Sequence, residues 1–273
     1  MSNMRLVSVN DNIFDTLMSE DEMIVFNLFE LIRKNDSAFI ATDDESYIFA
    51  ENSRRTPSWL FLKGKPSGKT FDELVTLVSG MVKLNALFKI NTREDYAAEL
   101  LDEVSRTCRV SYAAEIPMEV YACKKPAPFP SSDGQMISPR EEHREILKKF
   151  VVGMVRDSAG LVFGEDDTEK FTSALLSAQH FFLWESSEGK IVSMAKIAHK
   201  TDKYARLNAI FTDTEERGRD YTKMLTSTLS GSLIEEGVIP LIYTDMRDTK
   251  KNEAYRMLGY EKVGEITQFA FHQ

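Results

Sequence analysis

Apolar and polar positions in the second half of the chain alternate between helical and strand-like periods. Apolar residues three and four positions apart predict helices over 141–154, 167–178 and 221–233. Apolar runs bounded by turn residues predict strands over 180–184, 191–197, 205–212, 238–245 and 260–271. A short helix is predicted over 252–258, with Asn252 as its N-cap and Gly259 just past its end. The predicted order α-α-β-β-β-α-β-α-β is typical of an α/β (α+β) sheet with mixed strand directions.

The first half carries similar signals in the order β-α-β-α-β. Strands are predicted over 59–63, 87–90 and 110–121, and helices over 71–84 and 93–106. Between the halves lies KKPAPFPSSDGQ, where alternating prolines followed by turn residues predict a linker. We therefore expect a domain over 1–123, a linker over 124–137 and a second domain over 138–273. The two halves have a similar order of elements but show no repeat at the level of residues. The hypothesis of a duplicated fold therefore depends on the order of elements alone.

Composition and charge remove several functional classes. Apolar residues make up 42% of the chain and aromatic residues 10%, which excludes a disordered protein. The net charge of −9 argues against a nucleic-acid or anionic-membrane partner, since either would need a basic face. No 18-residue apolar run or signal peptide occurs. Because two cysteines cannot form a disulfide framework, we expect a reducing, cytoplasmic environment. Cys108, Cys123 and the scattered histidines lack metal-ligand spacing, so no metal is expected, while a single disulfide stays open.

The most informative stretch is NEAYRMLGY at 252–260, which directly follows a predicted strand ending in LIYTDM. Upstream, NAIFTDTEERGRD places a strand before a charged loop and a helix. These segments resemble the GNAT superfamily of acyl-CoA-dependent N-acetyltransferases. The residues at the family's spacing are Asn252, Tyr255, Gly259 and Tyr260. The resemblance covers about 138–273 and implies a mixed twisted sheet flanked by helices. In a tandem form, the first half would be a degenerate copy of the same domain.

The resemblance implies acetyl-CoA as cosubstrate, bound where a strand leads into a helix. A diphosphate is an anion, and the start of a helix presents unpaired N–H groups and the positive end of the helix dipole. The amide-rich pantetheine arm can pair with an exposed strand edge, as an added strand does. The implied cofactor contacts are Ile210, Phe211, Thr212, Arg217, Gly218, Arg219, Asp220, Tyr221, Thr222, Lys223 and Asn252.

The loop departs from the family's pattern at two positions. Asp220 stands where the first loop glycine is expected, and Thr222 where glycine or alanine is. Aspartate tolerates left-handed backbone angles better than most residues. Its charge is the greater obstacle, because a like charge ~4 Å away costs about 1 kcal/mol in water and ~4 kcal/mol at an intermediate dielectric. We also expect the Asp220 carboxylate to cap the following helix, in the place of a diphosphate.

Tyr255 and Asp245 are the candidate catalytic residues. By resemblance, Tyr255 lies near the thioester sulfur and protonates the leaving thiolate; the reference pKa values of phenol and thiol side chains differ by only ~1.5 units. Asp245 ends the strand before the short helix and would deprotonate a primary amine of a small molecule or peptide, given burial that raises its pKa. The structural alternatives are a core role for Tyr255 and a capping role alone for Asn252.

The function expected first is transfer of an acetyl group from acetyl-CoA to a primary amine. A second possibility is a non-catalytic acyl-CoA-binding or regulatory protein that keeps the GNAT fold, with Asp220 and Thr222 reducing turnover. A third, nucleotide binding, rests on KGKPSGKT at 63–70, between a predicted strand and a predicted helix. A Walker loop needs four residues between its two glycines, and only three separate Gly64 from Gly68.

Overall fold

The computed structural model describes residues 4–130 and 133–272, which form two compact units. Unit 1 contains the chain up to Val120, the segment Thr244–Asp248 and the segment from Lys262 onward. Unit 2 contains Tyr121–Tyr243 and Thr249–Glu261. The expected linker over 124–137 includes residues 131–132, which lie outside the described residues. Its boundaries, and those of the two expected domains, stay predictions.

Unit 1 contains most of the first half of the chain. Its elements are β1 (Arg5–Leu6), α1 (Ile13–Leu17), α2 (Glu20–Val25), α3 (Phe29–Ile32), β2 (Phe39–Thr42), β3 (Tyr47–Glu51), β4 (Ser58–Leu62), α4 (Gly68–Leu84), β5 (Lys89–Thr92), α5 (Glu94–Cys108), β6 (Ser111–Ala122) and β12 (Glu261–His272). The strands follow the order β1-β2-β3-β4-β5-β12-β6, with β4 and β5 parallel. The predicted order β-α-β-α-β corresponds to β4, α4, β5, α5 and β6 and is confirmed.

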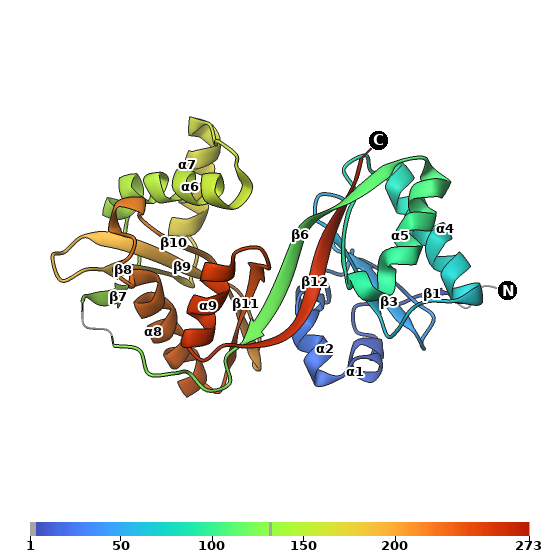
Figure 1. The fold of residues 1–273 in the computed structure, drawn as a ribbon, viewed down its shortest axis with the longest axis horizontal. Coiled ribbons are helices and arrows are strands. Elements are labelled where there is room, and N and C mark those ends of the chain that lie inside the picture. The colour runs from blue at the N-terminus through green and yellow to red at the C-terminus, as the bar shows by residue number, and fades with distance from the viewer. Residues whose placement is uncertain (1–3, 131–132, 273) are drawn as a thin grey trace. The chain divides into compact units, whose positions relative to one another are not determined.

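Helices cover both faces of the unit 1 strands. Leu74 of α4 and Leu101 of α5 are buried in one layer, against Leu60 of β4. On the opposite face, the ring centroid of Phe26 lies 5.3 Å from that of Phe61 and 6.3 Å from that of Trp59. Figure 1 shows α4 and α5 on one side of these strands and the first helices on the other. The short helices before β2 were not predicted, because each is too short to show a full apolar period.

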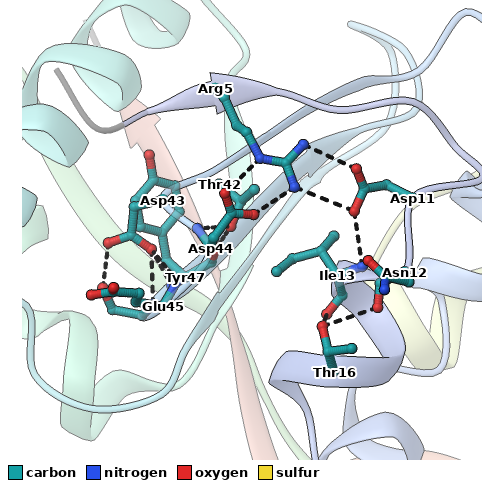
Figure 2. Close-up of polar contacts among 11 residues, drawn as sticks. Arg5, Asp11, Asn12, Ile13, Thr16, Thr42, Asp43, Asp44, Glu45 and Tyr47 are labelled. Atoms are coloured by element: carbon teal, nitrogen blue, oxygen red, sulfur yellow. Dashed lines mark hydrogen bonds and ion pairs between the residues drawn. The ribbon is translucent and has the colours of Figure 1, made fainter.

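Charged side chains hold the first strand of unit 1 in place (Figure 2). The Arg5 guanidinium donates to Asp44, with Nη2 and Oδ1 2.6 Å apart, and to Asp11, with Nη1 and Oδ2 3.0 Å apart. In the turn between β2 and β3, Asp43 Oδ1 accepts from the Ser46 N–H at 2.8 Å. Burial opposes ionisation of Asp43, but its hydrogen bonds, led by those from Ser46, lower its pKa overall. β1 thus combines backbone pairing with β2 and exposed ion pairs of Arg5.

Unit 2 contains most of the second half of the chain. Its elements are β7 (Gln135–Ile137), α6 (Arg144–Ala159), α7 (Glu165–Leu176), β8 (Phe181–Glu185), β9 (Ile191–Lys200), β10 (Tyr204–Thr212), α8 (Tyr221–Glu235), β11 (Ile239–Asp245) and α9 (Thr249–Met257). The strands follow the order β11-β10-β9-β8-β7, with β10 and β11 parallel and the others antiparallel. The predicted element order is confirmed, and β7 is added within the expected linker.

Two apolar layers enclose the unit 2 strands. Phe150 of α6 and Leu175 of α7 pack against Met194 of β9 on one face. Leu225 of α8 and Tyr255 of α9 belong to the layer on the other face. Figure 1 shows α6 and α7 on one side of β8, β9 and β10, and α8 and α9 on the other. The expected mixed sheet flanked by helices is therefore confirmed.

The last strand of the chain pairs inside unit 1. Thr267–Ala270 of β12 lie antiparallel to Lys89–Thr92 of β5, and Phe269 and Phe271 enter the unit 1 core. Residues from Lys262 onward, which the sequence placed in the second domain, therefore pack with unit 1. Apolar alternation predicts a strand and its buried face, but it does not specify the neighbouring strand.

Gly259 ends α9 at a place where only glycine fits. Its φ is 89°, in the left-handed region. An added Cβ would lie 2.5 Å from the Lys125 carbonyl oxygen and 2.6 Å from the Ala127 nitrogen, both backbone atoms. The predicted end of this helix is confirmed. Glycine is required here both by the left-handed backbone angle and by the close approach of the 125–127 backbone.

Candidate active site

Strand β10 separates from its parallel neighbour β11 part-way along its length. The two strands pair from Tyr204 opposite Ile239 to Leu207 opposite Ile242. Beyond Leu207, the register of β10 against β9 shifts, and Ala209 adopts a left-handed conformation with a φ of 49°. A bulge of this kind bends and twists a strand. The edge of β10 beyond Leu207 therefore offers backbone groups to an extended, amide-rich ligand.

The three candidate edge residues have different surroundings. Phe211 is buried in the layer beneath α6, with its ring centroid 5.6 Å from that of Phe150. Ile210 packs against the opposite layer, which contains α8 and α9. The Thr212 hydroxyl lies 2.6 Å from that of Thr222. Thr222, which replaces the family's small residue, therefore joins the end of β10 to the first turn of α8.

The loop before α8 contains two residues in the left-handed region. Gly218 has a φ of 84° and Asp220 a φ of 61°, so aspartate adopts a conformation that glycine would adopt without strain. Asp220 is the N-cap residue, but its side chain makes no capping hydrogen bond, and that part of the prediction is wrong. Usual N-caps have extended backbone; here the carboxylate pairs with Lys223 Nζ at 2.8 Å. The first-turn N–H groups therefore receive no side-chain cap from Asp220.

Each basic side chain of this loop pairs with a carboxylate. Arg217 pairs with Asp157 of α6, and its guanidinium carbon lies 5.4 Å from the centroid of the Phe211 ring. Arg219 Nη1 lies 3.0 Å from Glu216 Oε2. Such solvent-exposed pairs are worth ~0–1 kcal/mol, so an incoming diphosphate can replace the carboxylates. The loop therefore holds basic side chains in exposed ion pairs beside a helix start that Asp220 does not cap.

Asn252 and Tyr255 lie one turn apart on α9 and share a face. Asn252 is 2% exposed and Tyr255 6% exposed. Because α9 begins at Thr249, Asn252 lies inside the helix, and the prediction that it caps the helix is wrong. In the turn before the helix, the Asp248 N–H donates to the Asp245 carbonyl. The helix then begins three residues before the predicted start at Asn252.

Tyr255 belongs to the same apolar layer as Ile210 and Tyr221. Its ring centroid lies 5.9 Å from that of Tyr260, with the planes tilted by 59°. Tyr260 is fully buried, and its hydroxyl lies 2.7 Å from that of Ser230 in α8. Burial raises the pKa of Tyr260 well above its ordinary value, which suits a structural residue. Ile210 of the β10 edge, Tyr221 at the start of α8 and the candidate catalytic residue Tyr255 thus share the layer of α8 and α9. Phe211 lies in the other layer, with α6 and α7.

Asp245 ends β11 and belongs to the segment that packs with unit 1. Its Oδ2 lies 2.5 Å from Arg247 Nη2, and its Oδ1 accepts from the Arg247 N–H at 2.9 Å. This pairing raises the pKa of Arg247. Arg247 thus contacts both carboxylate oxygens of Asp245. General-base action by Asp245 stays a prediction, and it requires Arg247 to move aside.

A residue that the sequence did not single out, Asp133, holds the start of α8. Its Oδ1 accepts from the Ser187 hydroxyl at 2.5 Å and the Ser187 N–H at 2.9 Å, and its Oδ2 accepts from the Tyr221 hydroxyl at 2.6 Å. These hydrogen bonds, led by that of the Ser187 hydroxyl, lower the pKa of Asp133 to about 2. The candidate Tyr221 is therefore anchored through its side chain, and its backbone N–H belongs to the first turn of α8.

We expect the unfolding free energy of Asp133→Asn to fall less steeply at acidic pH than that of the wild type. The folded pKa lies below the ordinary value of ~3.9, so the carboxylate stabilises the protein fully above about pH 4, and this contribution is lost as pH falls through about 2. Denaturant unfolding from pH 7 to pH 2 should show a steeper decline for the wild type than for the variant. Parallel profiles would show that the carboxylate does not have this role.

The KGKPSGKT segment of unit 1 connects β4 to α4. It lines a cavity of about 320 Å³ together with Ser46 and Leu62. Thr70 Oγ1 lies 3.3 Å from Asp43 Oδ2 and donates to it. In a Walker loop, the hydroxyl at this place binds Mg²⁺. Its engagement by a carboxylate, together with the short spacing, does not favour nucleotide binding here.

Within the described residues, the two cysteines form no disulfide and no metal-ligand cluster occurs. Cys108 and Cys123 are free thiols, so the disulfide that the sequence left open does not form between them. Burial raises the pKa of the Cys123 thiol to about 11. Within 4–130 and 133–272, no group of three or more His, Cys, Asp or Glu side chains could hold a metal ion. Over the same ranges, no helix is long and apolar enough to cross a membrane.

Comparison with known proteins decides the fold. The family described as FR47-like protein matches residues 187–269, from just before β9 into β12. An acetyltransferase from the GNAT family of Colwellia psychrerythraea is 16% identical, with 98% of this chain and 99% of that chain covered and a TM-score of 0.57. The fold is that of the GNAT acetyltransferases. The resemblance of the C-terminal half is confirmed, and GNAT-like structure extends over nearly the whole chain.

Two further solved structures with the GNAT fold agree with this assignment. A GCN5-related N-acetyltransferase from Kribbella flavida is 14% identical, with 92% of this chain and 94% of that chain covered and a TM-score of 0.60. A tandem GNAT protein from the clavulanic acid biosynthesis pathway is 8% identical, with coverage of 98% and 97% and a TM-score of 0.53. The tandem GNAT form is therefore supported at the level of the fold. No curated protein sequence matches the chain.

Proposed function

We propose that the chain is an N-acetyltransferase that transfers an acetyl group from acetyl-CoA to a primary amine of a small molecule or peptide. The observation that carries the proposal is the course of β10. It separates from β11 after Leu207 and leads, through a loop with left-handed Gly218 and Asp220, into α8. One segment thus offers a strand edge for the pantetheine arm and a helix start for the diphosphate. A cytoplasmic location, without nucleic-acid or membrane partners, stays part of the proposal.

Acyl transfer would proceed by direct attack of the neutral amine on the thioester carbonyl. Backbone N–H groups of the β10 edge would stabilise the negative charge that develops on the carbonyl oxygen. When the tetrahedral intermediate collapses, the carbon–sulfur bond breaks and the thiolate takes the proton of the Tyr255 hydroxyl. The proton that the amine loses passes to water or to Asp245, and Tyr255 regains a proton from solvent. Protons and charge therefore balance over one turnover.

A second candidate function is acyl-CoA binding without turnover. Its supporting observation is the charge of the loop, where the Asp220 carboxylate lies at the start of α8 and pairs with Lys223. A carboxylate there opposes a diphosphate and weakens the cosubstrate site. Release of free thiol from acetyl-CoA in the presence of an amine distinguishes the enzyme from the binding protein.

Acetyl-CoA is expected to raise the melting temperature of the protein, and ATP is not. A ligand that binds only the native state, at ten times its Kd, adds about 1.4 kcal/mol, which corresponds to a rise of roughly 2–3 °C for a chain of this size. The measurement is a thermal melt with each ligand at millimolar concentration. A clear shift of the melting temperature with ATP and none with acetyl-CoA would reject the acetyltransferase proposal. It would favour nucleotide binding by the unit 1 loop at 63–70.

A further inference from the structure

Arg206 of β10 is a cation without an acidic partner. It forms no ion pair with any described residue, and its buried Nε has no hydrogen-bond acceptor. Burial lowers the pKa of Arg206. The residue as a whole is only partly buried. Because a buried, unsatisfied charged group is costly, an anion that completes its hydrogen bonds would be bound favourably.

The neighbours of Arg206 orient its guanidinium and do not neutralise it. Its guanidinium carbon lies 5.3 Å from the centroid of the Tyr243 ring, within the range of a cation–π contact. His199 lies directly opposite on β9 and is buried, and Leu241 lies opposite on β11. Tyr243 lies two residues beyond Leu241 on β11, so Tyr243 and Leu241 are on the same face of the sheet. An arginine beside an aromatic ring keeps its N–H edge for a planar, bidentate anion.

The position of Arg206 relates this anion site to the proposed chemistry. Arg206 lies just before the point where β10 leaves β11. The next residue, Leu207, points into the layer that contains Tyr255, so Arg206 points to the opposite face. A thioester held on the Tyr255 side and a ligand held by Arg206 would therefore lie on opposite faces of β10, at the point where β10 and β11 separate.

We propose that Arg206 binds a carboxylate of the acceptor, so that the acceptors are primary amines that carry a carboxylate. The substrate class rests on the proposed function, whereas carboxylate binding by Arg206 does not. A single guanidinium carries one positive charge and a planar pair of N–H donors, which favours a carboxylate over a phosphate dianion. Arg206 is then the residue that determines acceptor specificity.

Matched amines test the substrate class. β-Alanine and propylamine, and phenylalanine and phenethylamine, differ within each pair mainly in the carboxylate. Thiol release from acetyl-CoA should be roughly 10–100-fold more efficient, in kcat/KM, for the carboxylated amine, and mainly through KM. Arg206→Met should abolish this preference, and Arg206→Lys should restore part of it. Lys203→Met, which removes an exposed charge from the turn before β10, is the control and should keep the preference.

Binding without turnover provides an independent test. Arg206→Met removes a charge without a partner, so the unliganded variant should melt no lower than the wild type. Tens of millimolar β-alanine should raise the melting temperature of the wild type and of Lys203→Met, but not that of Arg206→Met. Equal effects on all three proteins, or none on any, would overturn the proposal. Protection by inorganic phosphate without protection by β-alanine would overturn the assignment to a carboxylate.

The two proposals fail in distinguishable ways. If acetyl-CoA neither binds nor turns over while β-alanine still protects only proteins with Arg206, the acetyltransferase proposal fails and the anion site holds. If thiol release occurs with propylamine as readily as with β-alanine, and Arg206→Met changes neither, the acetyltransferase proposal holds and the Arg206 proposal fails.

Discussion

Replacing Tyr255 by phenylalanine is expected to lower kcat by roughly ten- to a thousand-fold while the Kd of acetyl-CoA stays nearly constant. The substitution removes the hydroxyl that would protonate the leaving thiolate and keeps the ring that packs beside Tyr260. The apolar layer therefore retains its volume, and the effect is confined to the chemical step. Steady-state rates at saturating substrates, together with calorimetric titration of acetyl-CoA, separate kcat from affinity.

Tyr260→Phe is the matched control for this prediction. Tyr260 packs against Tyr255, and its hydroxyl shares a buried hydrogen bond with Ser230. Loss of that bond should cost about 1 kcal/mol of unfolding free energy and leave the rate per folded molecule unchanged. If Tyr255→Phe behaves like Tyr260→Phe, losing stability but keeping its rate, Tyr255 has no part in the mechanism.

Asp220→Gly should tighten CoA binding by roughly 5–30-fold. The carboxylate stands at the start of α8, and relief of 1–2 kcal/mol of repulsion toward the diphosphate corresponds to this gain. The φ of 61° suits glycine, and the side chain forms no capping hydrogen bond. The loss of stability that normally follows removal of an N-cap is therefore not expected. Lys223 would also lose its carboxylate partner and face the diphosphate.

Asp220→Asn separates charge from backbone geometry. Asparagine also tolerates left-handed angles and has nearly the same size, but it carries no charge. If repulsion limits affinity, calorimetric titration of CoA should show a gain for both variants over the wild type. A gain for glycine alone would assign the effect to the backbone. Weaker binding by both would mean that the aspartate belongs to a working cofactor site, against this account of the loop.

The parts of the fold that the sequence predicts are those with long apolar periods. Helices α4, α5, α6 and α8 and strands β9 to β12 bury continuous faces, and their patterns identify them. Strand β1 is two residues long, which is too short to show an apolar period, and it pairs with β2 and carries the ion pairs of Arg5. The pairing of β12 with β5 joins residues more than 170 positions apart, and no local pattern encodes such a pairing.

The candidate site was predictable where it depends on local spacing. The resemblance located the β10 edge, the loop before α8 and the residues of α9. It did not identify Asp157 as the partner of Arg217, or Asp133 as the anchor of Tyr221, because both lie far away in the sequence. Arg206 gave no signal either, since the sequence shows a charge within a strand and not whether that charge has a partner.

Hydrogen–deuterium exchange with and without acetyl-CoA tests the central claim most directly, because bound backbone amides exchange more slowly and the measurement locates them in the chain. The account predicts protection over 208–212 and 218–223, the edge of β10 and the start of α8, and no protection over the unit 1 loop at 63–70. Protection confined to 63–70, or no protection anywhere at saturating acetyl-CoA, would contradict it.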